Sequence, residues 1–227
     1  MSFPNSTGLP EAVPAAVSQI AEVMSGFPAH WCLCGGWAVD AWLGRQTREH
    51  GDIDISVFED GQRALLGHFE GWHLIAHDEV EPDADQAWDG RKLALPAHIH
   101  ASRDRDSVLA WVTEPKAPVE GTTVRLEIVI DARSENEWLL KPDPRVALPL
   151  RQAIGQTAWG VPAAAPEVLL FFKATAYFGQ GGQWKRPRDD ADFESLLPVL
   201  EPAQRAWLQS AIVQEIPAHP WLEALSG

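Results

Sequence analysis

Residues 32–40, CLCGGWAVD, and residues 48–55, REHGDIDI, decide the fold. The first segment predicts a buried strand, a tight turn at its two adjacent glycines and a short helix. The second predicts a strand in which Asp52 and Asp54 are two positions apart, so both carboxylates leave the same face. Apolar residues alternate with these acids, which indicates a core strand with one face open onto a site.

The two carboxylates carry the first chemical signal. At about 5 Å apart and an effective dielectric of about 20, two carboxylates repel each other by roughly 3 kcal/mol. A fold tolerates this repulsion when a positive charge lies between them. The usual one is a hard, oxygen-binding cation such as Mg²⁺.

The glycine pair, Gly35 and Gly36, stands directly before the predicted helix. Backbone N–H groups and the positive end of the helix dipole at such a position can bind a phosphate. Paired glycines also simply make tight turns, so the pair acquires meaning only from the motifs around it.

Size and composition are those of an ordinary globular protein. The chain has 227 residues, 45% of them hydrophobic and 22% charged, which suits one sizeable domain or a domain with a helical appendage. No apolar run approaches the length of a membrane span, and the N-terminus lacks a signal-peptide pattern. We therefore expect a cytoplasmic protein without membrane contact.

The net charge of −14 argues against general nucleic-acid binding, which needs a basic surface. This charge suits a cationic small substrate, or serves solubility alone. The two cysteines, Cys32 and Cys34, fall on one predicted strand, where they are poorly placed to bridge each other. We expect both to be reduced thiols.

Hydrophobic periodicity and the positions of glycine and proline predict the order of elements. Helices are expected at 14–24, 37–43, 62–69, 166–177, 187–198 and 202–215. Strands are expected at 31–34, 52–58, 72–76, 91–95, 97–101, 107–113 and 123–131.

The proline-rich stretch 142–149 is the plausible domain boundary. We expect a core over residues 1–145, with residues 1–13 loosely ordered, and a helical, substrate-binding C-terminal part over residues 146–227. Strands with helices first, then helices alone, predict an α+β fold: a mixed β-sheet with flanking helices, followed by a helical part.

The order of these motifs resembles that of the DNA polymerase β-like nucleotidyltransferases. The string GGWAVDAWLGRQTREHGDIDI is similar to the small aminoglycoside 2″- and lincosamide nucleotidyltransferases. The resemblance is strong over residues 32–58. It continues more weakly through EIVID at 127–131, Lys173 and RPRDDADF at 186–193.

The resemblance implies the transfer of a nucleoside monophosphate, AMP from ATP, to a hydroxyl of a small antibiotic-like acceptor such as an aminoglycoside or a lincosamide. Asp52, Asp54 and Glu127 would hold two Mg²⁺ ions that clamp the attacking and leaving oxygens. Glu127 would also accept the proton of the acceptor hydroxyl. Asp131, on the same predicted strand face, is the alternative base.

The nucleoside triphosphate would be bound by Gly35 and Gly36, with Arg48, His50 and Lys173 as further contacts. Each of these three side chains also has a structural reading: a solvated loop charge, a local hydrogen bond or an exposed helix face.

Two other whole-protein readings stay open: an antitoxin-type or regulatory nucleotidyltransferase that modifies a protein, and a nucleotide-binding module without catalysis. The long C-terminal part favours a small-molecule acceptor, because antitoxin-type modules are little more than the minimal core. The oligomeric state is left open.

Overall fold

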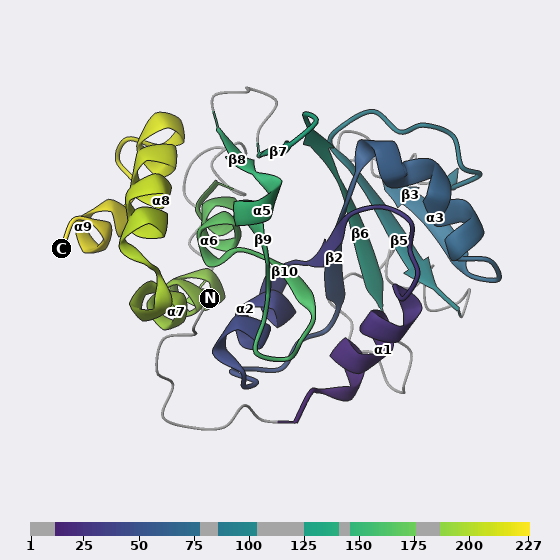
Figure 1. Cartoon of the computed structure of the whole chain (residues 1–227), viewed down its shortest axis with the longest axis horizontal. Helices are drawn as coiled ribbons and strands as arrows, with labels where there is room; N and C mark the ends of the chain where they lie inside the picture. The colour runs from purple at the N-terminus through teal and green to yellow at the C-terminus, as the bar shows by residue number, and fades with distance from the viewer. Residues whose placement is uncertain (1–11, 78–85, 104–124, 141–145, 176–186) are drawn as a thin grey trace.

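The computed structural model describes residues 12–77, 86–103, 125–140, 146–175 and 187–227 (Figure 1). Its helices and 3-10 turns are α1 Ala15–Val23, α2 Gly35–Leu43, η1 Glu59–Gly61, α3 Gln62–His68, α5 Leu150–Ala153, α6 Pro166–Thr175, α7 Pro187–Leu196, η4 Leu197–Val199, α8 Pro202–Glu215 and α9 Trp221–Leu225. Its strands are β1 Trp31–Leu33, β2 Ile53–Phe58, β3 His73–His77, β4 Gln86–Ala87, β5 Ala97–Ser102, β6 Leu126–Arg133, β7 Glu137–Leu139, β8 Ala147–Pro149, β9 Ile154–Gln156 and β10 Pro162–Ala164.

The strands form one mixed sheet in the order β4-β3-β5-β6-β2-β1-β10-β9, with β7 and β8 continuing from β6. The central pair, β2 and β6, is parallel, whereas β5 and β1 run antiparallel to their neighbours β6 and β2. The predicted α+β fold with a mixed sheet and flanking helices is therefore confirmed.

Alternation separates the aliphatic residues of the central strands from their acids. On β2, Ile53, Ile55 and Val57 are at most 2% exposed, and on β6 Leu126 and Ile128 are fully buried. These side chains join one apolar core with residues of α1 and α3. Because side chains alternate along a strand, the acids of β2 and β6 must leave the opposite face.

The C-terminal helices gather on one side of the molecule. Figure 1 shows α7, α8 and α9 together, far from β3 and β5, with α2 and α6 between them and the sheet. Helix α8 begins with a capping box in which Glu201 and Gln204 satisfy each other's backbone N–H groups. Among the helices described, none combines the length and apolarity of a membrane span.

Several sequence-based boundaries need correction. The glycine pair does not form a turn ahead of the helix: Gly35 is the first residue of α2. The carboxylate strand begins at Ile53, so Asp52 precedes it. The expected strand at 91–95 is wrong, since these residues are irregular. The expected strand at 107–113 lies outside the described residues.

The expectation of helices alone beyond residue 146 is also wrong. The short strands β8, β9 and β10 follow this position, and β10 pairs in parallel with β1 next to β2. The reason is their length, because segments of three residues carry too little periodicity to be recognised as strands. The sheet thus continues past the expected boundary before the C-terminal helices begin.

Candidate active site

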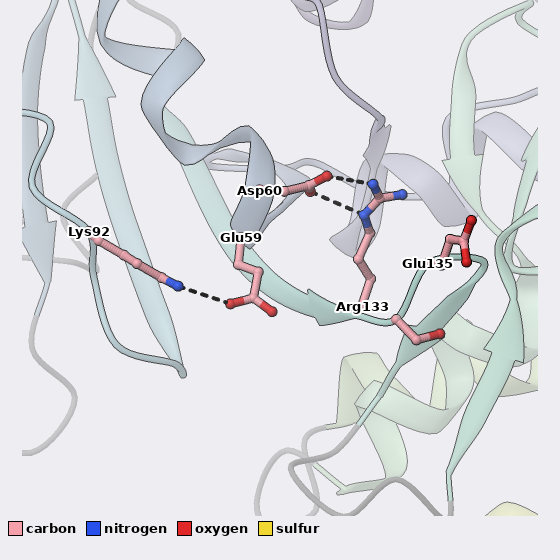
Figure 2. A pocket seen from close by; sticks show the side chains of 6 residues that line it. Glu59, Asp60, Lys92, Arg133 and Glu135 are labelled. Atoms are coloured by element: carbon pink, nitrogen blue, oxygen red, sulfur yellow. Dashed lines mark hydrogen bonds and ion pairs between the residues drawn. The ribbon is translucent and has the colours of Figure 1, made fainter.

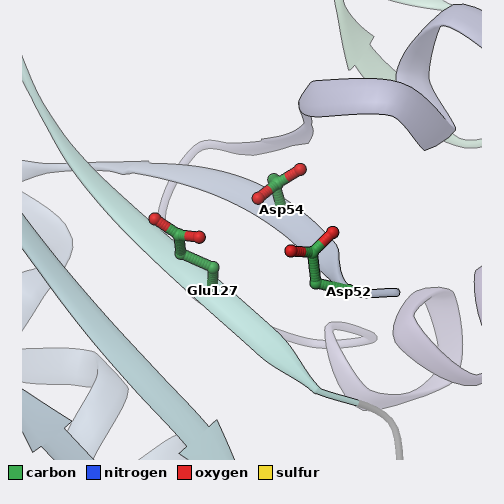
Figure 3. A group of neighbouring side chains, drawn as sticks. All are labelled: Asp52, Asp54 and Glu127. Atoms are coloured by element: carbon green, nitrogen blue, oxygen red, sulfur yellow. The ribbon is translucent and has the colours of Figure 1, made fainter. Parts of the chain in front are cut away.

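Three carboxylates meet at one end of the central strand pair (Figure 3). Asp54 on β2 is the register partner of Glu127 on β6, and Asp52 stands just before β2. Oxygen atoms of the three side chains all lie within 4.8 Å of one another. The structure thus brings together the three acids that the sequence predicted as one group.

The electrostatics of this group would favour a bound cation. Burial, Glu127 and Asp52 together raise the pKa of Asp54 well above its ordinary value. Desolvation by the surrounding protein and the Glu127 carboxylate likewise raise the pKa of Asp52. Burial and like charge both disfavour the ionised forms, so a cation bound between the oxygens would stabilise the group.

Glu127 differs from its two neighbours. Burial raises its pKa, but the hydrogen bond to His98 and the nearby imidazoles of His98, His100 and His77 outweigh this effect and lower it. The Nδ1 atom of His98 lies 2.5 Å from the Glu127 Oε1 atom. Glu127 is therefore held as a carboxylate, the form that binds a cation.

The glycine pair is required by close packing at the group. A Cβ on Gly35, whose φ is +60°, would overlap the Asp54 carboxylate, and a Cβ on Gly36 would overlap the side chains of Arg48 and His50. Only glycine leaves room for these side chains at the start of α2. The first N–H groups of a helix have no partner inside it, so this end of α2 offers donors beside the acids.

Two of the predicted phosphate contacts are linked by α7. The Lys173 Nζ atom lies 3.2 Å from Asp189 and 2.7 Å from Asp192, and the Arg48 Nη2 atom lies 3.5 Å from the same Asp192 carboxylate. The positive charge of Lys173 also offsets part of the rise in the pKa of Asp54. The cations are thus arranged between α7 and the acid group.

His50, the remaining predicted contact, is buried rather than directed outward. Its Nε2 atom lies 2.6 Å from Asp40, and its ring packs against that of Trp37 with centroids 4.3 Å apart. Side-chain and backbone groups of Thr47 donate to the other oxygen of Asp40. The structural reading of His50, a local hydrogen bond, is the one that this geometry supports.

On the other side of Glu127, β5 and β3 present histidines to the same sheet face. His100 is the register partner of Glu127, and its ring stacks on that of His77 with centroids 5.3 Å apart. Together with His98, these residues form an imidazole wall beside the base candidate. Among the described residues, the acid group is the one cluster of three or more potential metal ligands.

Asp131, the alternative base, lies four residues beyond Glu127 on β6, roughly 13 Å along the strand. Its carboxylate accepts a hydrogen bond from Ser56, and burial raises its pKa to about 6. It stands outside the group of three acids.

Sequence reasoning missed three contributors. Asp40 organises the segment before Asp52, Arg188 at the start of α7 counteracts the raised pKa of Asp52, and Asp192 joins Arg48 to Lys173. The signal for Asp40 was a charged residue in the otherwise apolar run of 37–43, and the signal for Arg188 and Asp192 was their place in the string at 186–193 that carries part of the resemblance. Asp192 had an adequate local reading, because acids in the first turns of a helix complement its dipole.

A hollow of ≈ 310 Å³ lies at the other end of β2 and β6 from the acid group (Figure 2). Arg133 pairs with Asp60 through two contacts of 3.1 and 2.5 Å, and Lys92 lies 3.6 Å from Glu59. The charges of Arg133 and Lys92 are thus neutralised by acids of the same hollow. At the other end of the strand pair, three carboxylates instead lie next to one another.

The donor set of the acid group fits Mg²⁺. Carboxylate oxygens are the ligands that this cation prefers, and burial together with the neighbouring carboxylates raises the pKa of Asp52 and of Asp54, which a bound cation would offset. With helix N–H groups and cations on one side, the arrangement can bind a polyphosphate next to a divalent cation.

Comparison with known proteins agrees with this chemistry. Residues 16–83 match the family model described as aminoglycoside-2″-adenylyltransferase. Comparison with curated protein sequences gave no match.

Solved structures with this fold cover nearly the whole chain. The crystal structure of ANT(2″)-Ia in complex with adenylyl-2″-tobramycin is 13% identical, with a TM-score of 0.54, over 87% of this chain and 95% of that one. Lincosamide antibiotic adenylyltransferase LnuA, lincomycin-bound, is 16% identical, with a TM-score of 0.51, over 83% of this chain and 99% of that one.

These likenesses confirm the resemblance that the sequence predicted. The family match includes the glycine pair, Asp52 and Asp54, and the fold match extends over the sheet and the helices. The chain is therefore similar to the aminoglycoside-2″-adenylyltransferases in its N-terminal third, has the fold of ANT(2″)-Ia and LnuA, and is indicated to be a nucleotidyltransferase of adenylyltransferase type.

Proposed function

We propose that this protein transfers AMP from ATP to a hydroxyl of a small antibiotic-like acceptor, with release of pyrophosphate. The observation that carries this proposal is the convergence of Asp52, Asp54 and Glu127 beside the glycine pair at the start of α2. The match of residues 16–83 to aminoglycoside-2″-adenylyltransferases supports the same reaction.

The three acids would hold Mg²⁺. When bound, two Mg²⁺ ions would neutralise charge on the phosphates and lower the pKa of the attacking hydroxyl. Asp54 lies at the centre of the group, between the α2 backbone and Glu127, so its loss should weaken binding most.

The triphosphate would lie along the start of α2. The N–H groups there, with Arg48 and Lys173, would bind its β- and γ-phosphates and so direct the α-phosphorus toward the acids. Asp192 keeps these two cations on the same side of the site. His50 would serve the triphosphate through the Arg48 segment rather than by direct contact, because it is buried against Trp37.

Glu127 would take the proton of the acceptor. The acceptor oxygen forms a bond to the α-phosphorus, the bond from that phosphorus to the bridging oxygen of pyrophosphate breaks, and the hydroxyl proton passes to the Glu127 carboxylate. The His98 imidazole, 2.5 Å from the Glu127 Oε1 atom, orients this carboxylate.

For the acceptor, an aminoglycoside or a lincosamide is supported by the named relatives. ANT(2″)-Ia was solved with an adenylylated tobramycin and LnuA with lincomycin. The net charge of −14 favours a cationic acceptor of this kind. We assign acceptor binding to the C-terminal part that the sequence predicted over residues 146–227.

A panel assay tests this function. Pyrophosphate release is measured with Mg²⁺, each of four nucleoside triphosphates, and a set of aminoglycosides and lincosamides. We expect release with ATP and at least one acceptor, and a product heavier than the acceptor by one AMP in mass spectrometry.

The control variants are Asp52→Ala and Asp54→Ala, which should abolish release while circular dichroism stays unchanged. Full activity in either variant would contradict the metal assignment. Transfer of AMP to a protein, with no small acceptor used, would instead favour the regulatory reading.

A further inference from the structure

The three acids are fixed in place by different means. Asp54 and Glu127 are register partners inside the β2–β6 ladder, so the backbone hydrogen bonds of the sheet set their positions. Asp52 is exposed and stands before β2, whose ladder to β6 begins with Ile53 opposite Leu126. Its carboxylate nevertheless reaches the group, so something outside the ladder must set the path of the chain before it.

The structure offers such a restraint at Asp40, on the last turn of α2. One oxygen of Asp40 accepts hydrogen bonds from the backbone N–H of Thr47, at 3.1 Å, and from its hydroxyl. The other oxygen lies 2.6 Å from the His50 Nε2 atom. One carboxylate thereby holds two points of the segment that leads into Asp52.

Burial makes this restraint stiff. The Asp40 side chain is 0% exposed and that of His50 is 3% exposed. A buried carboxylate must keep its hydrogen-bond partners, because an unsatisfied one costs several kcal/mol. The segment from Thr47 to His50 therefore has little freedom to move away from α2.

The same restraint reaches the glycine pair. His50 packs on Trp37, and its ring fills the space that a side chain at Gly36 would take. Arg48, which lies between the two anchored residues, thereby projects across Gly36 toward Asp192. Asp52 follows His50 by two residues.

We propose that Asp40 is a positioning residue for the metal site: through Thr47 and His50 it holds Asp52 in the carboxylate group. This inference rests on the metal site of the proposed function. It assigns Asp40 no contact with the metal or with either substrate.

Binding of Mn²⁺ alone, measured by electron paramagnetic resonance on the full chain, tests this role without turnover. Asp40→Asn keeps the shape of the side chain but removes its charge and one strong acceptor. We expect its Mn²⁺ affinity to fall by about 10–100-fold, the usual effect of losing a group that orients metal ligands. Glu167→Gln, which neutralises a buried carboxylate on α6, is the matched control and should bind Mn²⁺ as the wild type does.

Non-additivity separates positioning from a general loss of stability. If Asp40 acts through Asp52, then Asp40→Asn should change the Mn²⁺ affinity by less than about 2-fold in an Asp52→Ala background, but by its full factor in a Glu127→Gln background. Equal factors in both backgrounds would overturn the proposal. So would wild-type affinity in a folded Asp40→Asn.

Two variants cover the case in which Asp40→Asn fails to fold. Thr47→Val and His50→Gln each remove part of the restraint, and each should lower Mn²⁺ affinity by about 2–10-fold; wild-type affinity in both would overturn the proposal. Absence of Mn²⁺ binding by the wild type would remove the metal site and this inference with it. Lack of transferase activity alongside normal Mn²⁺ binding would contradict the proposed acceptor but not the role of Asp40.

Discussion

The molecule contains two groups of neighbouring carboxylates whose negative charges have different surroundings. In the sheet, Asp52, Asp54 and Glu127 face one another, and the first two have raised pKa values because like charges add to burial. In the C-terminal helices, Asp189 and Asp192 lie around the Lys173 ammonium, at 3.2 and 2.7 Å. The carboxylates of the first group have one another as neighbours, whereas the negative charge of the second group is neutralised by a cation of the fold.

The difference follows from what places each group. The sheet acids are brought together by the backbone register of β2 and β6, which acts regardless of side-chain charge. The helix acids are held by the cation they surround. Removing one carboxylate should therefore have opposite effects on the stability of the metal-free protein in the two places.

Asp54→Asn should break the first group most completely. We expect kcat/KM for transfer to fall by at least about 10³-fold, since a ligand of the Mg²⁺ ions that would neutralise the reacting phosphate is lost. In EDTA at neutral pH the same variant should melt about 2–4 °C above the wild type, as relief of about 1 kcal/mol would give.

The sign follows from proton linkage. Because the pKa of Asp54 is raised in the folded state, this carboxyl lowers the free energy of unfolding as the pH rises above 3.8, the ordinary pKa of an aspartate. The gain in melting temperature should thus vanish near pH 3.5, where the group is protonated in both states. Glu70→Gln, which neutralises an exposed acid, is the control. A melting temperature of Asp54→Asn below that of the wild type at neutral pH would contradict the description of the sheet group.

Glu127→Gln sharpens the roles inside the sheet group. We expect kcat to fall about 10²-fold with a smaller change in the KM for ATP, because a proton acceptor acts in the transition state more than in binding. Steady-state kinetics measure both. The matched variant is Asp131→Asn, which neutralises the carboxylate farther along β6; a loss confined to it would transfer the base role there.

Asp192→Asn should act on the second group with the opposite sign on stability. It leaves the partly buried Lys173 ammonium with one carboxylate partner, Asp189, instead of two. Because that partner remains, we expect the free energy of unfolding to fall by about 2 kcal/mol. The KM for ATP should rise several-fold as Lys173 and Arg48 lose their common anchor.

Asp190→Asn is the control on the same helix, because its amide oxygen can still accept the hydrogen bond from Trp221. Calorimetry in EDTA measures the difference. Stabilisation by Asp192→Asn would show that the helix acids also repel, and would remove the contrast.

The smallest effect on activity is expected at Glu167, an enclosed acid outside both groups. Burial raises its pKa to about 7, and the Gln204 amide donates to it at 2.6 Å. The wild type should lose about 3 kcal/mol of stability as the pH rises from about 4.5 to 7 through this group, since the folded state binds its proton more tightly. Glu167→Gln should make the free energy of unfolding, measured in urea titrations, less dependent on pH and should leave kcat unchanged. The same pH dependence in the variant as in the wild type would mean that other groups cause it.

The sequence predicted the sheet group because its geometry is local. Two acids at spacing two share a strand face by covalent geometry, and the alternation of 126–131 assigns Glu127 a face as well. That the two faces coincide follows only from the parallel pairing of β2 and β6, which no periodicity could give. The resemblance implied only that the three acids act together.

The remaining features depend on contacts between residues far apart in the chain. The Asp192 carboxylate meets Arg48 across 144 positions, and short strands such as β10 exist because β1 is there to pair with them. Helix α8 was predicted with its bounds, Pro202 to Glu215, because its capping box and proline are local signals.

The site combines residues that lie far apart in the sequence, and this has a consequence during synthesis of the chain. The ligands come from residues 52, 54 and 127, and the cations that face them are anchored by residue 192. A chain still emerging from the ribosome would therefore hold an incomplete centre until α7 is made. Truncated products that end before α7 should accumulate as inactive polypeptides rather than as weak transferases.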